Sequence, residues 1–404
     1  MRITKLQVHG YRSCLDMTLE PRGQLSVLIG PNSSGKTSIL NALLLLQKLT
    51  VERPYRTREE ATGQCELKAW FDVDGAVAIL TAKADIYTDD SNNDAVVSSE
   101  QRWYARDLTG NRKHIHLPLE FLAQRQDDRE RYYFYTRRRL RLPMSEVQKL
   151  APTTLAALTS IAEELAGMRY YSASQFTNPG KCPVAFEIEQ QGPWTRSLTR
   201  RGHAKFLYDL YRASGDPESS GYAQYIDVVG PNGIGLVDQI TFEELQTSSV
   251  EYSVRSGGAI QKRRREKKLV VPRFQIGNNN LSPNQLSEGT FKTITLLFYL
   301  ITEKSRILLV EEPEVCVHHG LLSSIIELIQ SYSSEKQIII STHSDFVLDA
   351  VAPEDVFVVT NDEAEGTKVS NIRRRMHRKE LAALRNYLNT EGNLGEYWRH
   401  GGLE

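Results

Sequence analysis

The sequence predicts an α/β fold, a mixed sheet with flanking helices, and three observations lead to this prediction. A short apolar run, Leu25–Ile29, has the length and composition of a buried strand and leads directly into a glycine-containing loop and a leucine-rich helix. Two later apolar runs, Arg306–Val310 and Gln337–Ile340, have the same strand character, and each ends in polar residues. In sheets of this kind, ligands bind beyond the carboxyl ends of the strands. The sequence therefore predicts a ligand site at that edge.

The loop after the first strand, Gly30–Thr37, reads G-P-N-S-S-G-K-T and matches the pattern G-x-x-x-x-G-K-[ST] between a strand and a helix. Its two glycines let the backbone curl so that successive N–H groups point at phosphates, and the helix N-terminus adds partial positive charge. Lys36 is expected to reach the outer phosphates, and the Thr37 hydroxyl to bind Mg²⁺. ATP or GTP binding is thus predicted. The predicted nucleotide-binding residues of this loop are Asn32, Ser33, Gly35, Lys36, Thr37 and Ser38.

Polar residues follow the two later strands. Glu311 and Glu312 come directly after the first of them, and His343 follows the second. Glu311 would hold the Mg²⁺ hydration shell together with Thr37, and Glu312 would polarise the attacking water. His343 would donate a hydrogen bond to the γ-phosphate. Solvated acids and a structural histidine are the alternatives, but the position of both segments downstream of a phosphate loop favours Glu312 and His343 as catalytic residues.

A second segment suited to anion binding, Leu286–Thr290, opens a helix that is predicted to run from Phe291 to Thr302. Ser287 and Gly289 lie at its N-terminus, where serine and glycine favour anion binding. One chain already has its own phosphate loop, so a second anion site implies a second subunit. We therefore expect a head-to-tail dimer that closes over two nucleotides.

The order and chemistry of these segments resemble the ABC ATPases. Walker A would be Gly30–Thr37, the signature Leu286–Thr290, Walker B with its catalytic acid Leu308–Glu312, and the switch histidine His343. The signature departs from L-S-G-G-Q, and the first Walker B acid is Glu rather than Asp. Both departures are common in the RecF/SMC-like and OLD-family ATPases, including those of bacterial anti-phage systems.

Segments near both ends are similar to that branch. The start Leu6–Ser13 resembles the family's opening, which implies that Arg12 contacts a nucleotide phosphate or base. Glu312–His318 is similar to the family's E-P-E-x-x-x-H, although Gly320 stands where proline is usual. Glu391–Trp398 looks like the closing motif.

The resemblance also implies a glutamine that senses Mg²⁺ and the γ-phosphate, the Q-loop residue. Met168–Ala173 predicts a strand that leads to Gln175, which makes Gln175 one candidate. Gln124 and Gln126 are the competing candidates.

Residues 51–280 contain none of these motifs. The predicted ABC-type P-loop head therefore consists of residues 1–50 with Walker A and 281–404 with the signature, Walker B and switch, around a large α+β insertion. That length argues against an ABC transporter subunit. Inside it, Glu66–Tyr87 predicts a hairpin around Asp74-Gly75, and Ser145–Gly167 predicts a helix.

Charge and composition set the expected location. The chain has 50 basic and 50 acidic residues, and no apolar run is long enough to span a bilayer. The 4 cysteines form no disulfide or metal-binding spacing, which favours free thiols in a cytoplasmic protein.

Three basic tracts stand out: Arg125–Arg141, which is interleaved with aromatic residues, Gln261–Lys268 in a hairpin or loop, and Arg373–Lys379. Arginines neutralise phosphates and aromatic rings stack on bases, so a nucleic-acid surface is one interpretation. The other interpretation is a solvated face or a docking surface for an acidic partner protein.

The stretch after His343 predicts a strand pair and a terminal helix. This stretch is too short to contain the Toprim nuclease domain of the OLD family. By this analogy, we expect an ATPase subunit of an anti-phage defence system that acts as sensor and scaffold for a separate effector, a nuclease. A RecF-like DNA-repair ATPase is the alternative. A second alternative is a nucleotide-gated interaction module with negligible turnover.

Overall fold

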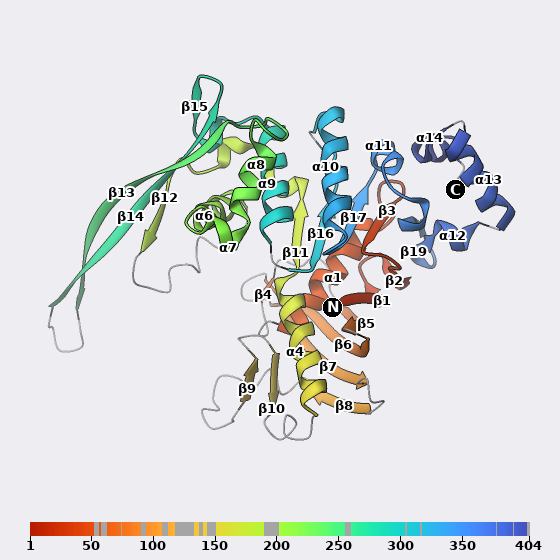
Figure 1. The fold of residues 1–404 in the computed structure, drawn as a ribbon. Coiled ribbons are helices and arrows are strands. Elements are labelled where there is room, and N and C mark those ends of the chain that lie inside the picture. Colours follow the sequence, from red (N-terminus) through yellow and green to blue (C-terminus); the bar gives the residue numbers. More distant parts are fainter. Residues whose placement is uncertain are drawn as a thin grey trace. The chain divides into compact units, whose positions relative to one another are not determined.

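The fold is that of a computed structural model. It describes residues 1–51, 56–57, 63–73, 75–89, 94–106, 112–117, 133–136, 140–143, 151–189, 202–254, 260–303, 305–315, 317–376, 378–390 and 392–401. The chain divides into two compact units (Figure 1). Unit 1 comprises Met1–Tyr171, Lys304–Glu312 and Ile326–Glu404, and unit 2 comprises Ser172–Glu303 and Pro313–Ile325.

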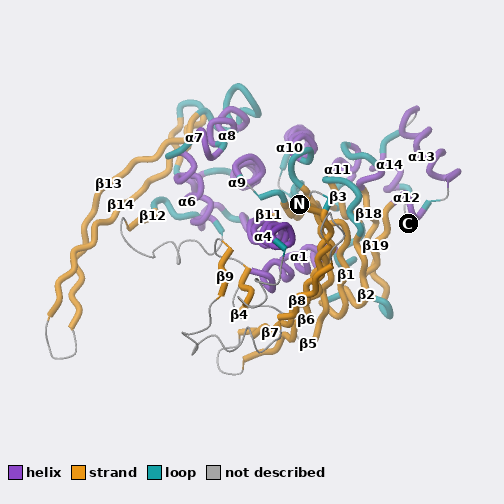
Figure 2. The backbone as a smooth tube through the Cα atoms, turned by 60° about the horizontal axis from the view of Figure 1, so that its bottom comes forward, coloured by secondary structure: helices purple, strands orange, loops and turns teal. Residues whose placement is uncertain are grey.

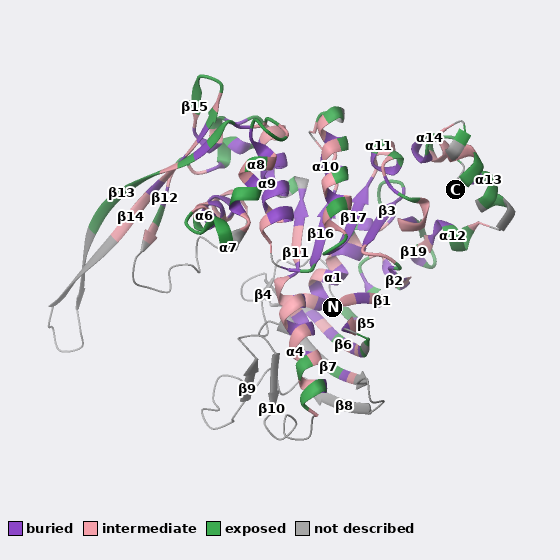
Figure 3. Ribbon diagram, in the orientation of Figure 1, coloured by how far each residue is buried: buried purple, intermediate pink, exposed green. Residues whose placement is uncertain are grey.

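A six-stranded sheet in unit 1 carries the predicted ligand edge. Its order is β11-β16-β17-β3-β18-β19, in which β16, β17, β3 and β18 run parallel and β19 returns antiparallel to β18. Every residue of β3, β16 and β17 is buried (Figure 3), as expected for strands covered on both faces. The three predicted apolar strands are thus confirmed. The strand bounds are β3 Leu25–Ile29, β11 Arg169–Ser172, β16 Ile307–Glu311, β17 Gln337–Thr342, β18 Val356–Asp362 and β19 Gly366–Asn371.

An antiparallel sheet forms a second layer of unit 1, in the order β2-β1-β5-β6-β7-β4 with β8 on β7. Along β5, buried and partly exposed residues alternate, which is the pattern of a sheet with one face on the core. The predicted hairpin is confirmed as β5 and β6, while Asp74 lies outside the described residues. The bounds are β1 Arg2–Tyr11, β2 Cys14–Leu19, β4 Arg56–Thr57, β5 Gly63–Val73, β6 Ala76–Asp89, β7 Asp94–Arg106 and β8 Arg112–Leu117.

Two helices, α1 (Lys36–Val51) and α4 (Pro152–Gly167), pack against each other and against both sheets (Figure 2). Their apolar faces and the facing strands form one continuous core. Pro152 occupies the first turn of α4, where its missing N–H costs nothing. The first residues of the predicted helix from Ser145 fall outside the described part of the chain. A short hairpin, β9 (Tyr133–Thr136) and β10 (Leu140–Pro143), completes the strands of this unit.

The stretch after His343 contains the predicted strand pair, β18 and β19. The described residues after this pair form three helices, α12, α13 and α14, rather than one terminal helix. Asn371 and Asn393 each cap a short helix, because each side chain accepts an N–H from the following turn. The Asn393 cap separates α14 from α13. The bounds are α10 His319–Tyr332, α11 Asp345–Asp349, η4 Pro353–Asp355, α12 Ile372–Arg375, α13 Arg378–Thr390 and α14 Leu394–Arg399.

Unit 2 joins a small sheet, ordered β12-β14-β13 with β15 on β14, to a helical cluster. Helix α9 is buried among α6 and α8 through edge-on aromatic contacts, such as Phe206 with Phe291 and Phe298. The bounds are η1 Ala173–Phe176, η2 Pro179–Lys181, β12 Phe186–Glu189, α6 His203–Ser214, α7 Pro217–Ser220, α8 Tyr222–Val229, β13 Gln239–Val254, β14 Ile260–Ile276, β15 Asn279–Leu281, η3 Pro283–Gln285 and α9 Glu288–Thr302.

Candidate nucleotide site

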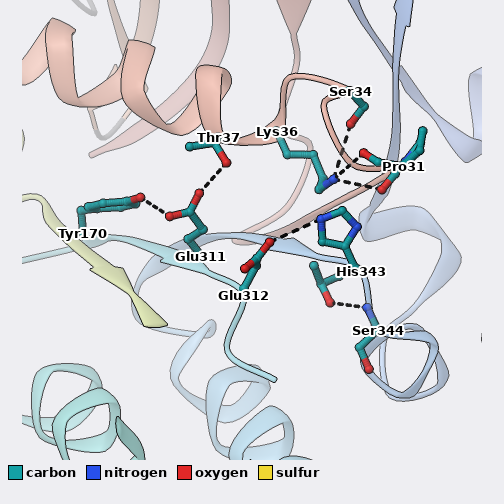
Figure 4. A network of polar contacts seen from close by, with 11 residues as sticks. Pro31, Ser34, Lys36, Thr37, Tyr170, Glu311, Glu312, His343 and Ser344 are labelled. Carbon is teal, nitrogen blue, oxygen red and sulfur yellow. Dashed lines mark hydrogen bonds and ion pairs between the residues drawn. The ribbon is translucent and has the colours of Figure 1, made fainter. Parts of the chain in front are cut away.

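The three polar segments after β3, β16 and β17 meet at one edge of the six-stranded sheet (Figure 4). Strand β17 lies between the other two, with Ser341 opposite Glu311 and Thr342 opposite Ile29. Parallel strands in register end together, so the phosphate loop, the acidic pair and His343 emerge side by side. This edge is the predicted one.

The phosphate loop, Gly30–Thr37, has a backbone that its two glycines make possible. Gly35 has φ +104°, and a Cβ there would lie 2.0 Å from the Thr367 hydroxyl. A Cβ at Gly30 would lie 2.1 Å from the Val359 carbonyl oxygen. Ser33 also has positive φ, at +65°. A residue with a Cβ fits neither glycine position, which explains the pattern in physical terms.

Lys36 is folded back on its own loop. Its side chain is buried, and its Nζ donates to the Gly30 and Pro31 carbonyl oxygens, each at 2.9 Å. A buried ammonium needs such acceptors. The contacts keep the loop curled around a positive charge, which suits an anionic ligand inside the curl. Asn32 and Ser33 lie exposed at the tip of the same loop.

The first acid, Glu311, is buried and bound by two hydroxyls. Thr37 Oγ1 donates to Glu311 Oε1 at 2.5 Å, and Tyr170 OH donates to Glu311 Oε2. Thr37 and Glu311, the two predicted metal ligands, are therefore in direct contact. Mg²⁺ commonly binds through one or two protein oxygens, waters and substrate phosphates, and this pair fits that requirement. Within the described residues, no group of three His, Cys, Asp or Glu forms a separate metal site.

The second acid, Glu312, faces the switch histidine. His343 Nε2 lies 3.4 Å from Glu312 Oε1. Glu312 has φ +49°, an unfavourable conformation for a non-glycine residue, and its N–H donates to the Ser341 carbonyl oxygen at 2.9 Å. The sheet thus holds a strained backbone that turns this carboxylate away from the strand direction.

His343 is partly buried, and its environment favours the neutral imidazole. Burial lowers the pKa of His343 below its usual 6.5, and the nearby Lys36 charge lowers it further. Glu312 and a hydrogen bond with the Gly30 backbone act in the opposite direction. At neutral pH the ring is uncharged, so its approach to Glu312 is not an ion pair.

The opening segment lies against the loop through a chain of hydroxyls. Thr367 Oγ1 donates to Ser13 Oγ at 2.9 Å, and Ser13 Oγ donates to Ser38 Oγ at 2.9 Å. Arg12 is exposed beside them, at φ +53°, with its guanidinium 5.6 Å from the centre of the Tyr11 ring. Ser38 directly follows the phosphate loop, and Arg12 adjoins Ser13, whose hydroxyl contacts Ser38.

The remaining predicted site residues, Ser287, Gly289 and Gln175, lie in unit 2. Ser287 is the exposed N-cap of α9, and its Oγ accepts the Thr290 N–H at 3.1 Å. The helix therefore begins at Glu288, three residues before the predicted Phe291, because this cap starts it earlier. Gly289 lies in its first turn. Gln175 lies in η1, and its side chain is outside the described residues, as are Gln124 and Gln126.

Lys267, Lys268 and Arg374, from two of the basic tracts, are in ion pairs. Lys267 and Lys268 on β14 pair with Glu187 and Glu244 at 2.8 Å each. Arg374 pairs with Glu20 at 2.6 Å. These side chains support the sheet and the C-terminal helices. Most of Arg125–Arg141 lies outside the described residues, as do the side chains of Gln261–Glu266.

The segments identified by resemblance have local structural roles. The Gly395 N–H, in the closing segment, donates to Asp349 Oδ1 of α11 at 2.7 Å. This contact ties α14 to the helix that directly follows His343 and Ser344. His318 Nδ1 accepts the Gly320 N–H at 3.3 Å at the start of α10.

Two contacts of the site were missed in the sequence. Tyr170 belongs to the predicted strand Met168–Ala173, and only its place at the edge of the sheet could have suggested a contact with Glu311. Thr367 lies on β19 and follows no recognised pattern, so no signal in the sequence identifies it.

Two protein-family models match the chain. The model described as "AAA ATPase domain" matches residues 1–180. The model described as "AAA domain, putative AbiEii toxin, Type IV TA system" matches residues 236–349. The first match contains the phosphate loop, and the second contains the signature segment, both acids and His343. No curated protein matches the chain.

Solved structures similar to the chain include three SMC heads. One is an SmcHead bound to the C-winged helix domain of ScpA, at 14% identity and TM-score 0.46, covering 92% of this chain and 97% of that one. The head from Thermotoga maritima has 11% identity and TM-score 0.37, covering 92% and 99%. The Pyrococcus furiosus head, bound to the C-terminal domain of ScpA, has 12% identity and TM-score 0.43, covering 95% and 99%.

Among the described residues, no helix is long and apolar enough to cross a membrane. The α/β fold with its phosphate loop is the predicted fold class. The two family matches support ATP binding and ATPase activity for this chain.

Proposed function

We propose that this chain is a Mg²⁺-dependent ATPase subunit of a bacterial anti-phage system, in which ATP turnover controls a partner effector, a nuclease. One observation carries the enzymatic part. A single sheet edge brings the phosphate loop, Thr37 with Glu311, and Glu312 with His343 into contact. These are the groups that phosphoryl transfer to water requires.

Each group has a role that follows from its chemistry. The loop N–H groups and Lys36 bind the phosphates, and Thr37 and Glu311 hold Mg²⁺ and its water shell. Bound Mg²⁺ would neutralise charge that develops on the phosphates. Glu312 accepts a proton from the attacking water, and the neutral His343 ring orients the outer phosphate.

The second half of each site would come from another copy of the chain. Ser287 is exposed at the N-terminus of a 15-residue helix, and Gly289 lies in its first turn. Helix N-termini attract phosphates through their N–H groups and dipole. We therefore propose a head-to-tail dimer, with Ser287 and Gly289 of one copy completing the loop of the other. Arg12 and Gln175 would contact the nucleotide from the opening segment and η1.

The defence role and the nuclease partner rest on the resemblance of the nucleotide motifs to OLD-family ATPases of bacterial anti-phage systems. The description of the family model that matches residues 236–349 names a putative toxin and a Type IV TA system. That description supports a chain that works with a second protein.

The enzymatic proposal is tested by phosphate release from ATP, with Mg²⁺ and with EDTA. We expect turnover by the wild type only with Mg²⁺, and a large loss in Glu312→Gln. Glu335→Gln is the matched control, since Glu335 is an exposed acid of the same unit. ATP hydrolysis in EDTA at the rate seen with Mg²⁺ would refute the metal dependence.

The defence proposal is tested by counting phage plaques on cells that carry this gene with its neighbouring gene. Protection is expected from the wild type and from Glu335→Gln, and neither from Glu312→Gln nor from Lys36→Ala. Equal protection by all four would show that ATP turnover does not control the effector.

A further inference from the structure

Tyr170 contacts the metal-side acid from a strand that carries none of the recognised nucleotide motifs. Strand β11 is the neighbour of β16 in the six-stranded sheet, so Tyr170 lies beside the end of the strand that carries Glu311. The Tyr170 hydroxyl donates to Glu311 Oε2, while Thr37 Oγ1 donates to Oε1 at 2.5 Å (Figure 4). Each carboxylate oxygen of Glu311 thus accepts one hydroxyl.

The need for a second hydroxyl follows from the length of the glutamate. A glutamate has one more rotatable bond than an aspartate, and its terminal torsion is broad, so its carboxylate plane is poorly fixed by the strand alone. Glu311 is 9% exposed, which leaves little water to compete with protein donors. Two hydroxyls on opposite oxygens fix that plane.

The two hydroxyls differ in what a bound metal would do to them. Thr37 is itself a proposed Mg²⁺ ligand, so its oxygen would be shared with the ion. Tyr170 lies on the other oxygen of Glu311, and its ring packs against the core of unit 1. Its contact with Glu311 therefore does not depend on the ion and can set the carboxylate before Mg²⁺ arrives.

We propose that Tyr170 is a positioning residue for the metal side of the site. Its hydroxyl holds Glu311 in the orientation that receives the Mg²⁺ water shell, and so increases the Mg²⁺ affinity of the ATP complex. This inference rests on the proposed Mg²⁺-dependent ATPase function.

The test is Tyr170→Phe, which removes the hydroxyl and keeps the ring. ATP affinity is measured by calorimetry across a Mg²⁺ titration and separately in EDTA. We expect unchanged affinity in EDTA, and a Mg²⁺ midpoint raised about tenfold, the usual scale for losing a group that orients a metal ligand. The turnover number at saturating Mg²⁺ should stay close to that of the wild type.

Tyr171→Phe is the matched control. It makes the same chemical change at the next position of β11, on the opposite face of the strand, where Tyr171 is 2% exposed. Its Mg²⁺ midpoint should equal that of the wild type. Unfolding temperatures of both variants show whether either loss of a hydroxyl acts through stability.

The same substitution in a Glu311→Asp variant tests whether Tyr170 acts through the Glu311 carboxylate. In Glu311→Asp the shorter carboxylate is drawn back toward β16, away from the Tyr170 hydroxyl. Adding Tyr170→Phe to Glu311→Asp should therefore change the Mg²⁺ midpoint by less than twofold. Equal effects of Tyr170→Phe in both backgrounds would contradict the inference.

The outcomes separate this inference from the proposed function. Wild-type ATP binding that responds to Mg²⁺, with the same midpoint in Tyr170→Phe, overturns the role of Tyr170 alone. A wild type whose ATP binding and turnover ignore Mg²⁺ overturns the proposed function, and this inference with it. An equal loss of ATP affinity in EDTA and in Mg²⁺ for Tyr170→Phe would show a structural role instead.

Discussion

The phosphate loop and the signature segment are two helix N-termini of similar composition, but they differ in the contacts that the described residues of their own units make with them. At the loop, Lys36 donates to the Gly30 carbonyl oxygen, and Thr37 contacts Glu311. The Thr367 hydroxyl packs directly against Gly35. At the signature, Ser287 caps its own helix through the Thr290 N–H. The loop is thus assembled within one unit, whereas the signature is an ordinary capped helix that is exposed at Ser287.

We propose that the phosphate site at the loop depends on the groups that other strands bring to this helix N-terminus. Strands β16, β17 and β19 bring Glu311, His343 and Thr367 to the loop. We propose that for the signature, a second copy of the chain supplies the loop and its nucleotide. Substitutions can change the two termini separately and then together.

The largest effect is expected at the loop, because the loss of ATP binding there removes turnover as well. Lys36→Ala removes the buried ammonium, and we expect ATP affinity to fall roughly 100-fold, since a charge-assisted hydrogen bond contributes about 3 kcal/mol. Calorimetric titration with ATP checks this. Lys83→Ala, a change at an exposed lysine of unit 1, should bind as the wild type does. Unchanged affinity in Lys36→Ala would mean that phosphates bind elsewhere.

The next effect is expected at Glu312, the second acid of the pair. Glu312→Gln keeps the shape of the side chain and removes its basicity, so ATP should still bind while turnover slows at least ~100-fold. Steady-state phosphate release and ATP titration on the same preparation measure both. Hydrolysis at the wild-type rate would disprove the assignment of Glu312 as the base.

An intermediate effect is expected when the two termini are tested in one mixture. Lys36→Ala and Ser287→Arg subunits should each be inactive, but a mixed dimer would contain one site with both changes and one with neither. Partial recovery of ATPase is therefore expected, provided that one intact site can turn over. Ser248→Arg, at an exposed serine of β13 in the same unit, should remain active alone.

The smallest effect concerns pH. Burial and Lys36 lower the pKa of His343 below 6.5, so the ring is neutral at pH 7 and gains its charge only as the pH falls through that lowered value. The protonated ring would pair with Glu312 and hold the carboxylate away from water. We expect ATPase to fall severalfold on this acid limb, and the limb to flatten in His343→Gln. A pH profile with the same limb in both proteins would exclude His343 as its origin.

The loop, the acids and His343 could be predicted from the sequence because each motif is local. Leu25–Ile29 was predicted with its observed bounds, since an apolar run bounded by polar residues fixes a buried strand. The placement of these residues on a shared edge follows from the general behaviour of parallel strands. The strand order β16-β17-β3 could not be predicted, because it joins segments far apart in the chain.

The contacts that complete the site could not be predicted because they are long-range. Tyr170 and Glu311 are 141 positions apart, and Thr367 and Ser13 are 354 apart. A tyrosine on an edge strand and a threonine on a returning strand are ordinary residues in those places. The early start of α9 has a local cause: a serine at this position favours anion binding and helix capping alike, and in the structure Ser287 caps the helix.

The central claim is that ATP is hydrolysed between the loop of one chain and the signature of another. The most direct test is light scattering of Glu312→Gln, with and without Mg²⁺-ATP, beside the double variant Glu312→Gln with Ser287→Arg. The account predicts a dimer of Glu312→Gln only with ATP, and a monomer of the double variant in both conditions. Full ATPase activity in wild-type protein that stays strictly monomeric with ATP would contradict it.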